Sequence, residues 1–573
     1  MTDQTVEGGL DEPEELEPDQ GSLALADAGD RHSRADWEAA AAGVLRKAGR
    51  LADDDPDAEV GDRLAVRTLD RVAVTPLGTP DLLDDLATAG RPDRAGDWDI
   101  RTHLSVVSGS ERAANEALLV DLANGATSLW LRGADLDLAT LLEGVLLDLA
   151  PIVLDGVDPG SFLDHAGDRE LHPGTNLGHG VAGSSTDALA ATAARAKGAG
   201  VLGFVVDASE IHDRGASDAQ ELAYSLAVGA TYLRALADAG VGVDEAAALV
   251  EFRYAATDEQ FPTIAKLRAA RRLWARVLEL SGAGARRQRQ HAVTSRPMMS
   301  AYDPWVNMLR TTVAAFAAGV GGADAITVLP FDSPLGVPDA FGRRIARNTS
   351  SLLIAESHVA RVSDPAGGSF AVEKLTDDLA RTAWEIFGRL EDGESLDEMV
   401  AATVEQRDRD VARRKRPITG LSEFPHLGEA LPEREADSAA GDVRRYGAGF
   451  EALRDEPVAT PVFLATMGTV ASHTARAGFA ANLFAAGGVP VEVAGATVGV
   501  ESLIEAYDGQ SVVCLAGTDA AYEEWGAEAA EALRANGASW VIVAGQPREW
   551  ADDSCAVGVD ALEFLARTRE RLA

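Results

Sequence analysis

Cysteine is scarce in this chain: Cys514 and Cys555 are the only two among 573 residues. They form no C-x-x-C pair, and Cys514 lies in the apolar run SVVCLAG. A disulfide-stapled secreted fold and a cysteine-based metal site both need more thiols than this. We therefore expect two reduced thiols, as is typical of a cytosolic protein. No clustering of His, Cys and carboxylates suggests metal ligands, so we expect no metal site.

Long apolar runs are also missing. No stretch approaches the roughly 20 apolar residues that a membrane-spanning helix needs. The first twenty residues, MTDQTVEGGLDEPEELEPDQ, are acidic and have neither a basic nor an apolar segment, unlike a signal peptide. We expect a cytoplasmic protein whose residues 1–34 form a disordered acidic tail, because this segment has little to bury.

The chain has far fewer basic than acidic residues. The chain has 52 Lys and Arg against 92 Asp and Glu, a formal net charge of −40. This balance argues against binding to nucleic acid phosphates and to anionic membrane surfaces. We interpret the acidic residues as solubilising faces of a globular protein. A chain of this length exceeds one small core, so two or three domains are expected.

A repeated alternation of strand and helix begins near Trp98. Eight such units predict a (β/α)8 barrel with parallel strands and right-handed connections. A helix is expected at 135–148. The interval 156–200 is rich in Gly and Pro and fits the alternation of strand and helix less clearly. The predicted strands are 102–106, 127–131, 151–154, 201–207, 250–254, 291–295, 325–329 and 359–362.

A second alternating block follows a polar connector at residues 417–446. It contains strands at 462–465, 490–493, 511–516 and 540–543, separated by helices, which predicts a flavodoxin-like doubly wound domain. The overall prediction is an α/β protein with an N-terminal TIM barrel and a C-terminal flavodoxin-like domain. The expected segments are a tail (1–34), an N-terminal arm (35–97), the barrel (98–390), a helical linker (391–458) and the flavodoxin-like domain (459–573).

The stretch from 201 to 233 carries the candidate catalytic residue. A Val-rich strand, VLGFVVDAS, is followed by a short polar loop with His212 and then by a helix. Barrel enzymes carry their active sites at the carboxyl ends of the strands, where His212 is expected, and a His titrates near neutral pH. The alternative is a surface His without a role.

Five stretches resemble the methylmalonyl-CoA mutase family of adenosylcobalamin-dependent acyl-CoA mutases. The block IAKLRAARRLW is the most specific, and the likeness extends from about residue 35 to the end. The five stretches are WDIR (98–101), IAKLRAARRLW (264–274), RIARNT (344–349), VSDPAGGSFAVEKLTDDLARTAW (362–384) and PITGLSEFP (417–425).

The resemblance implies a barrel that takes acyl-CoA through its axis and a C-terminal domain that holds the corrinoid. Catalytic members carry a D-x-H-x-x-G motif whose His binds cobalt and is oriented by the Asp. Here His473 stands two residues after Ala471, and the next glycine is Gly478, five residues on. The orienting carboxylate is missing and the spacing is wrong, so we expect no cofactor-binding residues in this chain.

The barrel also lacks residues that catalytic members of the family carry. His212 matches the family residue that hydrogen-bonds the thioester carbonyl, but the paired Gln and Arg that hold the substrate carboxylate have no evident counterpart in 156–200. We interpret His212 as a matched but vestigial catalytic residue, because a lone His cannot perform a radical rearrangement that belongs to the cofactor.

This pattern is similar to the small (beta) subunit of the heterodimeric bacterial enzymes. The resemblance implies a large (alpha) catalytic subunit as partner, which binds adenosylcobalamin and acyl-CoA, while the present chain stabilises it. Two alternatives stay open. One is a self-sufficient acyl-CoA mutase of altered substrate, and the other is a non-enzymatic regulator of a mutase.

Overall fold

The computed structural model describes residues 29, 32–84, 86, 88–180, 183–284, 286–437 and 441–573. The predicted disordered tail lies outside these residues, apart from Gly29 and residues 32–34. Two compact units are distinguished: residues 1–66 with 73–79, and residues 67–72 with 80–573. Each unit is described by itself.

The smaller unit is built around helix α1 (Arg34–Lys47), which lies at the start of the predicted N-terminal arm. Ser33 caps it, because its hydroxyl accepts from the Asp36 amide while the Asp36 carboxylate accepts from the Ser33 amide. A small cluster of Ala42, Leu45, Leu51 and Val60 joins α1 to α2 (Val60–Leu64). This unit therefore has a core of its own.

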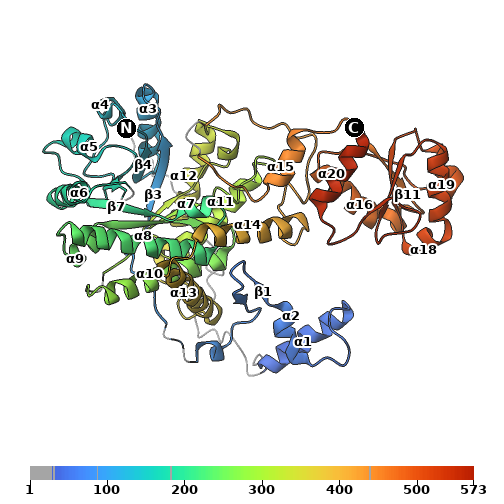
Figure 1. Ribbon diagram of the computed structural model, residues 1–573, viewed down its shortest axis with the longest axis horizontal. Helices are drawn as coiled ribbons and strands as arrows, with labels where there is room; N and C mark the ends of the chain where they lie inside the picture. Colours follow the sequence, from blue (N-terminus) through green and yellow to red (C-terminus); the bar gives the residue numbers. More distant parts are fainter. Residues whose placement is uncertain are drawn as a thin grey trace, which may run out of the picture. The chain divides into compact units, whose positions relative to one another are not determined.

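The second unit contains a closed barrel of eight parallel strands, in the order β10-β3-β4-β5-β6-β7-β8-β9 (Figure 1). This confirms the predicted barrel. The strands are β3 (Asp99–Ser105), β4 (Ser128–Arg132), β5 (Ile152–Asp155), β6 (Asn176–His179), β7 (Leu202–Asp207), β8 (Val250–Ala256), β9 (Arg289–Thr294) and β10 (Ala325–Thr327). The main outer helices are α3 (Glu111–Ala123), α6 (Thr186–Ala199), α8 (Asp218–Asp238), α10 (Gln260–Leu280), α11 (Val306–Val320), α12 (Ala340–Ala355) and α13 (Phe370–Glu391).

One of the eight predicted strands is wrong. Residues 359–362 form a short 3-10 turn, η6 (Val359–Arg361), whose apolar Val359 packs beside α10 and α11. The missing strand is β6, inside the interval 156–200. Strand β6 has no apolar run, and two of its residues instead fit it between its neighbours. The Asn176 side chain donates a hydrogen bond to the Phe204 carbonyl. Gly178 lies against the Leu154 backbone, where a Cβ would be 1.9 Å from the carbonyl oxygen.

The helix predicted at 135–148 is also wrong. A single helical turn forms there, α4 (Leu138–Leu141), with the Asp137 carboxylate accepting from the amides of Ala139 and Thr140. Leu146 and Leu149, beyond this turn, are exposed at 60% and 66%. The leucines of residues 135–148 favour a helix by their intrinsic propensity. The helix nevertheless ends after one turn, and the chain continues to β5 (Ile152–Asp155).

The lower layer of the barrel interior is a buried ion pair. The Arg101 guanidinium from β3 lies 2.7 Å from the Glu251 carboxylate of β8, and both side chains have no exposed surface. Arg289 reaches the same carboxylate at 3.1 Å. Burial opposes ionisation of Glu251, but Arg101 and Arg289 outweigh it and lower the pKa of this carboxyl.

The layer above it, toward the carboxyl ends of the strands, consists of aromatic and cationic side chains. The Trp130 ring lies 4.0 Å from the His103 ring and 3.8 Å from the Arg253 guanidinium carbon. Arg253 is paired with Asp207 at 2.5 Å, and His291 is hydrogen-bonded to the Thr327 hydroxyl at 2.7 Å. Side chains of both layers thus occupy the barrel axis.

The C-terminal part contains a five-stranded parallel sheet in the order β12-β11-β13-β14-β15. This is the strand order of flavodoxin-like folds. Four strands were predicted and are present; the fifth, β15, was not predicted. The bounds are β11 (Val462–Thr466), β12 (Val491–Val493), β13 (Val512–Ala516), β14 (Trp540–Ala544) and β15 (Asp553–Cys555).

Helices cover both faces of this sheet. Helices α16 (Val470–Ala486) and α20 (Ala561–Leu572) pack on one face, and α17 (Val500–Glu505) and α19 (Ala527–Ala535) pack on the other (Figure 1). Cys514 and Cys555 are buried and unpaired. Helices α14 (Leu396–Ala412) and α15 (Ala448–Asp455) lie between barrel and sheet in the sequence. Among the described residues, no helix combines the length and apolarity needed to cross a membrane.

A turn at Thr68–Val72 caps helix α8 from outside. The Thr68 amide donates to the Val72 carbonyl, and Arg71 adopts a positive φ of 63°. The turn presents Asp70, which accepts hydrogen bonds from the Ser217 hydroxyl and the Ala219 amide at the helix start. Burial raises the pKa of Asp70 to about 6, and the nearby Asp218 adds to the shift.

The axial ion pair yields a stability prediction. We expect Arg101→Leu to lower the free energy of unfolding of the barrel by about 3–5 kcal/mol, because Glu251 loses its main partner in a dry interior. The double change Arg101→Leu with Glu251→Leu should lose less than the single change. The measurement is urea unfolding followed by hydrogen exchange of β3 and β8 amides.

A matched control for this prediction is Arg112→Leu. The ion pair of Arg112 with Glu143 is exposed at 62% on both side chains, so its loss should cost less than about 1 kcal/mol. A double variant that is less stable than Arg101→Leu alone would contradict the interpretation of the pair.

The Asp70 turn predicts a pH dependence. The pKa of Asp70 is about 6 in the folded chain and 3.8 ordinarily, so the folded chain binds a proton at Asp70 more tightly than the unfolded chain does. Protonation of Asp70 therefore stabilises the fold below pH 4, and this contribution to the free energy of unfolding is lost as pH rises through 6. Asp70→Asn should remove about 2–3 kcal/mol of the stability difference between pH 4 and pH 7.5. Unfolding free energies of the wild type, Asp70→Asn and the exposed control Asp238→Asn, compared at both pH values, test this. An unchanged pH slope in Asp70→Asn would disprove it.

Candidate functional site

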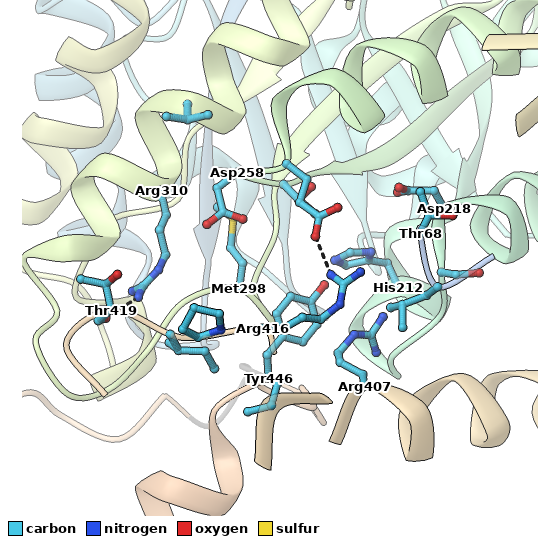
Figure 2. Close-up of a pocket in the computed structure, with 18 of the residues that line it drawn as sticks. Thr68, His212, Asp218, Asp258, Met298, Arg310, Arg407, Arg416, Thr419 and Tyr446 are labelled. Atoms are coloured by element: carbon cyan, nitrogen blue, oxygen red, sulfur yellow. Dashed lines mark hydrogen bonds and ion pairs between the residues drawn. The ribbon is translucent and has the colours of Figure 1, made fainter. Parts of the chain in front are cut away.

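A cavity of about 570 Å³ opens at the carboxyl ends of β7 and β8. The turn at Thr68–Asp70, the start of α8, the residues after β8 and the side of α11 form its walls, and α14 and Tyr446 close it (Figure 2). In this view Asp258 lies between Arg310 and His212. This is the end of a barrel that carries active sites.

His212 lines this cavity, as the sequence predicted, but on a short helix, α7 (Ser209–Asp213), rather than on a loop. It is only 2% exposed. Its Nε2 lies 2.7 Å from the Ser295 hydroxyl, and its Nδ1 lies 3.5 Å from the Glu221 carboxylate. Both ring nitrogens therefore face groups of the protein.

Glu221 belongs to a buried network that sequence analysis missed. Its carboxylate accepts from the Ala255 amide at 2.7 Å and lies 2.7 Å from the Lys266 ammonium, which also reaches Asp218 at 2.8 Å. Burial alone would lower the pKa of Lys266, but the two carboxylates outweigh it and raise that pKa. The network ties α8, α10 and β8 together behind His212. Its one sequence signal is Lys266, inside the block IAKLRAARRLW.

The arginines that follow Lys266 form ion pairs. Arg268 is fully buried and contacts Asp364 and Glu373, the latter at 2.6 Å, while Arg272 lies 2.7 Å from Asp377. The contacts that Arg268 and Arg272 make within the chain are therefore salt bridges. They join α10 to α13 and to the turn that begins at Asp364.

His473 does not join this cavity. It lies in the first turn of α16, is 6% exposed, and its Nδ1 has no hydrogen-bond partner among the described residues. An axial ligand of cobalt needs an accessible ring whose other nitrogen is held by a carboxylate. The residues present here do not fit a corrinoid, because the ring is buried and no acid orients it.

The cavity has the groups for hydrogen bonding rather than for metal or nucleophilic chemistry. Arg310 donates to Asn307 and to the Thr419 carbonyl, and Arg416 is paired with Glu259 at 2.6 Å. In the described part of the chain, no three His, Cys, Asp or Glu side chains converge as metal ligands. His212 holds a hydrogen bond to Ser295 at Nε2, whereas its buried Nδ1 has no hydrogen-bond partner among the described residues.

Comparison with known proteins identifies the family. The family model described as methylmalonyl-CoA mutase matches residues 197–448. The methylmalonyl-CoA mutase small subunit of Streptomyces virginiae is 44% identical over 97% of this chain and 99% of its own length. The small subunit of Propionibacterium freudenreichii subsp. shermanii is 34% identical over 96% of both chains, and a probable small subunit of Mycobacterium tuberculosis is 39% identical over 91% of this chain and 93% of its own. With its barrel, its parallel C-terminal sheet and near full-length relatives, the chain belongs to the methylmalonyl-CoA mutase family.

Proposed function

We propose that this chain is the small, non-catalytic subunit of a cytoplasmic, adenosylcobalamin-dependent methylmalonyl-CoA mutase, an isomerase that interconverts (R)-methylmalonyl-CoA and succinyl-CoA. Its partner is a large subunit that binds both the cofactor and the acyl-CoA. The present chain forms a heterodimer with that subunit and stabilises it. The cofactor supplies the radical chemistry of the rearrangement, and no step of it is assigned to residues of this chain.

The observation that carries this proposal is the filled barrel axis. The family resemblance implies that a catalytic barrel takes acyl-CoA along its axis. Here that path holds the Arg101–Glu251 pair, with both side chains fully buried, and above it the stack of His103, Trp130 and Arg253. Opening it would leave charges buried without partners, at several kcal/mol each. A chain so packed is suited to a structural role.

The two histidines of the resemblance support the same role. His212 is hydrogen-bonded to Ser295 and lies 3.5 Å from Glu221, and we interpret its matched position as that of a vestigial catalytic residue. His473 is buried in α16 without an orienting acid. The C-terminal sheet is then a cobalamin-type domain that kept its fold without its ligand.

The N-terminal arm is the proposed contact with the large subunit. The smaller compact unit has its own core around α1, and within it Val44 and Val66 are exposed at 66% and 65%. Exposed apolar side chains on a segment of this kind favour burial against a partner. We also propose the domain limits expected from the sequence, with the barrel at 98–390, the linker at 391–458 and the sheet domain at 459–573.

Reconstitution tests the proposal. The chain is purified alone and with the large subunit of the same organism, and mutase turnover, corrin absorbance and the mass of the complex are measured. We expect a one-to-one complex with activity and bound corrin, and neither from this chain alone. Turnover by the isolated chain would identify a self-sufficient mutase. An active large subunit that forms no stable complex with this chain would leave only the regulator alternative.

The role of His212 is tested within that complex. We expect His212→Asn to change kcat and KM of the complex by less than about twofold. A residue that does not contact the substrate contributes nothing to the binding of the transition state. The matched control is the corresponding His of the large subunit, whose replacement should abolish most turnover. A loss of more than about tenfold in kcat with His212→Asn, in a complex of unchanged mass and thermal stability, would make His212 catalytic.

A further inference from the structure

A small cavity of about 30 Å³ lies between strand β3 and helix α12. Side chains of a strand alternate between its two faces, so Thr102 faces the outer helices whereas Arg101 and His103 face the barrel axis. The cavity therefore belongs to the layer between the barrel and its helices, and it shares no lining residue with the cavity that contains His212. It is lined by residues 100–103 of β3, Asp121 of α3, Val328 and Pro330 after β10, and Arg343, Ala346, Arg347 and Ser350 of α12.

Two guanidinium groups share one carboxylate at this cavity. Arg347 and Arg343 lie 2.5 and 2.6 Å from the two oxygens of Asp121. In the described part of the chain, no other acidic side chain forms an ion pair with either arginine. The cluster therefore carries one positive charge in excess.

Burial makes this excess charge unfavourable. The side chain of Arg343 is 20% exposed and is hydrated in part, whereas those of Arg347 and Asp121 are 4% and 5% exposed. Arg347 consequently depends on Asp121 and on the cavity for its interactions. A charge in an interior without a full counter-charge is strongly destabilising, so an anion beside Arg347 would stabilise the fold.

Three hydrogen-bond donors of the lining have no acceptor. The Nε of Arg347 and the Oγ1 of Thr102 are buried and have no partner among the described residues. Ser350 is fully buried, and its hydroxyl accepts from the Trp98 indole at 3.4 Å, which leaves the hydroxyl proton without an acceptor in the part of the chain that the structure describes. Buried donors of this kind require an ordered water or an ion.

Size and charge select the occupant. The cavity has room for about one or two water-sized species, so polyatomic anions such as sulfate exceed it. A water molecule fits, but it carries no charge, and its two protons would add to the donors that lack acceptors. An anion of a single atom accepts from all the donors and balances the excess positive charge.

We propose that this cavity binds a chloride ion, held by the Nε–H of Arg347 and by the hydroxyls of Thr102 and Ser350. The ion neutralises the arginine cluster and thereby fastens α12 to β3. The site gives a use to the block RIARNT (344–349), which contains Arg347 and which the proposed function leaves without one. The inference does not rest on the mutase role, because every group that holds the ion belongs to this chain.

Hydrogen exchange of the full-length chain tests the proposal. Exchange of α12 amides is measured in sodium chloride, sodium bromide and sodium gluconate, each at about 0.15 M so that screening is equal. We expect the amides of α12 to exchange about fourfold or more slowly in chloride than in gluconate, which corresponds to a dissociation constant of about 50 mM or tighter. Bromide should act like chloride, and amides of α19 in the C-terminal sheet domain should not respond.

Two variants locate the ion. Thr102→Val keeps the size of the side chain and removes its hydroxyl, so the slowing by chloride should fall at least about twofold. Arg347→Met leaves Asp121 paired with Arg343 alone, and because that pair is balanced, the response to chloride should disappear.

Each variant has a matched control at an exposed position. Thr312→Val, on the outer side of α11, removes a threonine hydroxyl far from any excess charge. Arg112→Met removes an arginine of α3 whose side chain is 62% exposed. Both controls should keep the wild-type response to chloride.

Anomalous diffraction from crystals of the wild type grown in sodium bromide is the second measurement, and it decides if Arg347→Met fails to fold. We expect a bromide peak between Arg347 and Thr102. Equal exchange of α12 amides in chloride and gluconate overturns the proposal, as does a cavity that contains water only. Equal loss of the response in Thr102→Val and Thr312→Val would assign the effect to salt at the surface and would also overturn it.

Discussion

The desolvation of charge inside the barrel is the constraint on which the rest of the structure depends. Arg101 and Glu251 are taken fully out of water, and this costs several kcal/mol per ion unless each meets an opposite charge in good geometry. The eight strands provide that geometry, because β3 and β8 direct these side chains to the same level of the axis. At this level the barrel axis is therefore occupied by side chains of the chain itself.

The same solution recurs on the outside of the barrel. Lys266 is buried between Asp218 and Glu221, and Arg268 is buried between Asp364 and Glu373. Both cations come from one helix, α10, whose inner face would otherwise have to be apolar. His212 lies against this network through Glu221. His212 thus lies beside a network that joins α8, α10 and β8.

Surface and interior differ in how charge is used. The chain has 40 more acidic than basic residues, and a large net charge of one sign favours solubility. In the interior, burial and then the charges of Arg296, Arg253 and Arg132 lower the pKa of His103.

The sequence by itself determined the parts with regular period and strong composition. Apolar runs predicted seven of the barrel strands and the sheet strands β11 to β14, because buried parallel strands must be apolar on both faces. The helix after His212, α8, was also predicted. The sequence also located His212 and the missing Asp before His473. Tertiary structure alone decided the rest. Strand β6 is held by Asn176 and Gly178 through contacts to neighbouring strands, and residues 359–362 turn because Val359 packs on helices. The filling of the axis and the hydrogen bond of His212 with Ser295 join residues 27 to 150 positions apart, and such distant pairings leave no local pattern to detect.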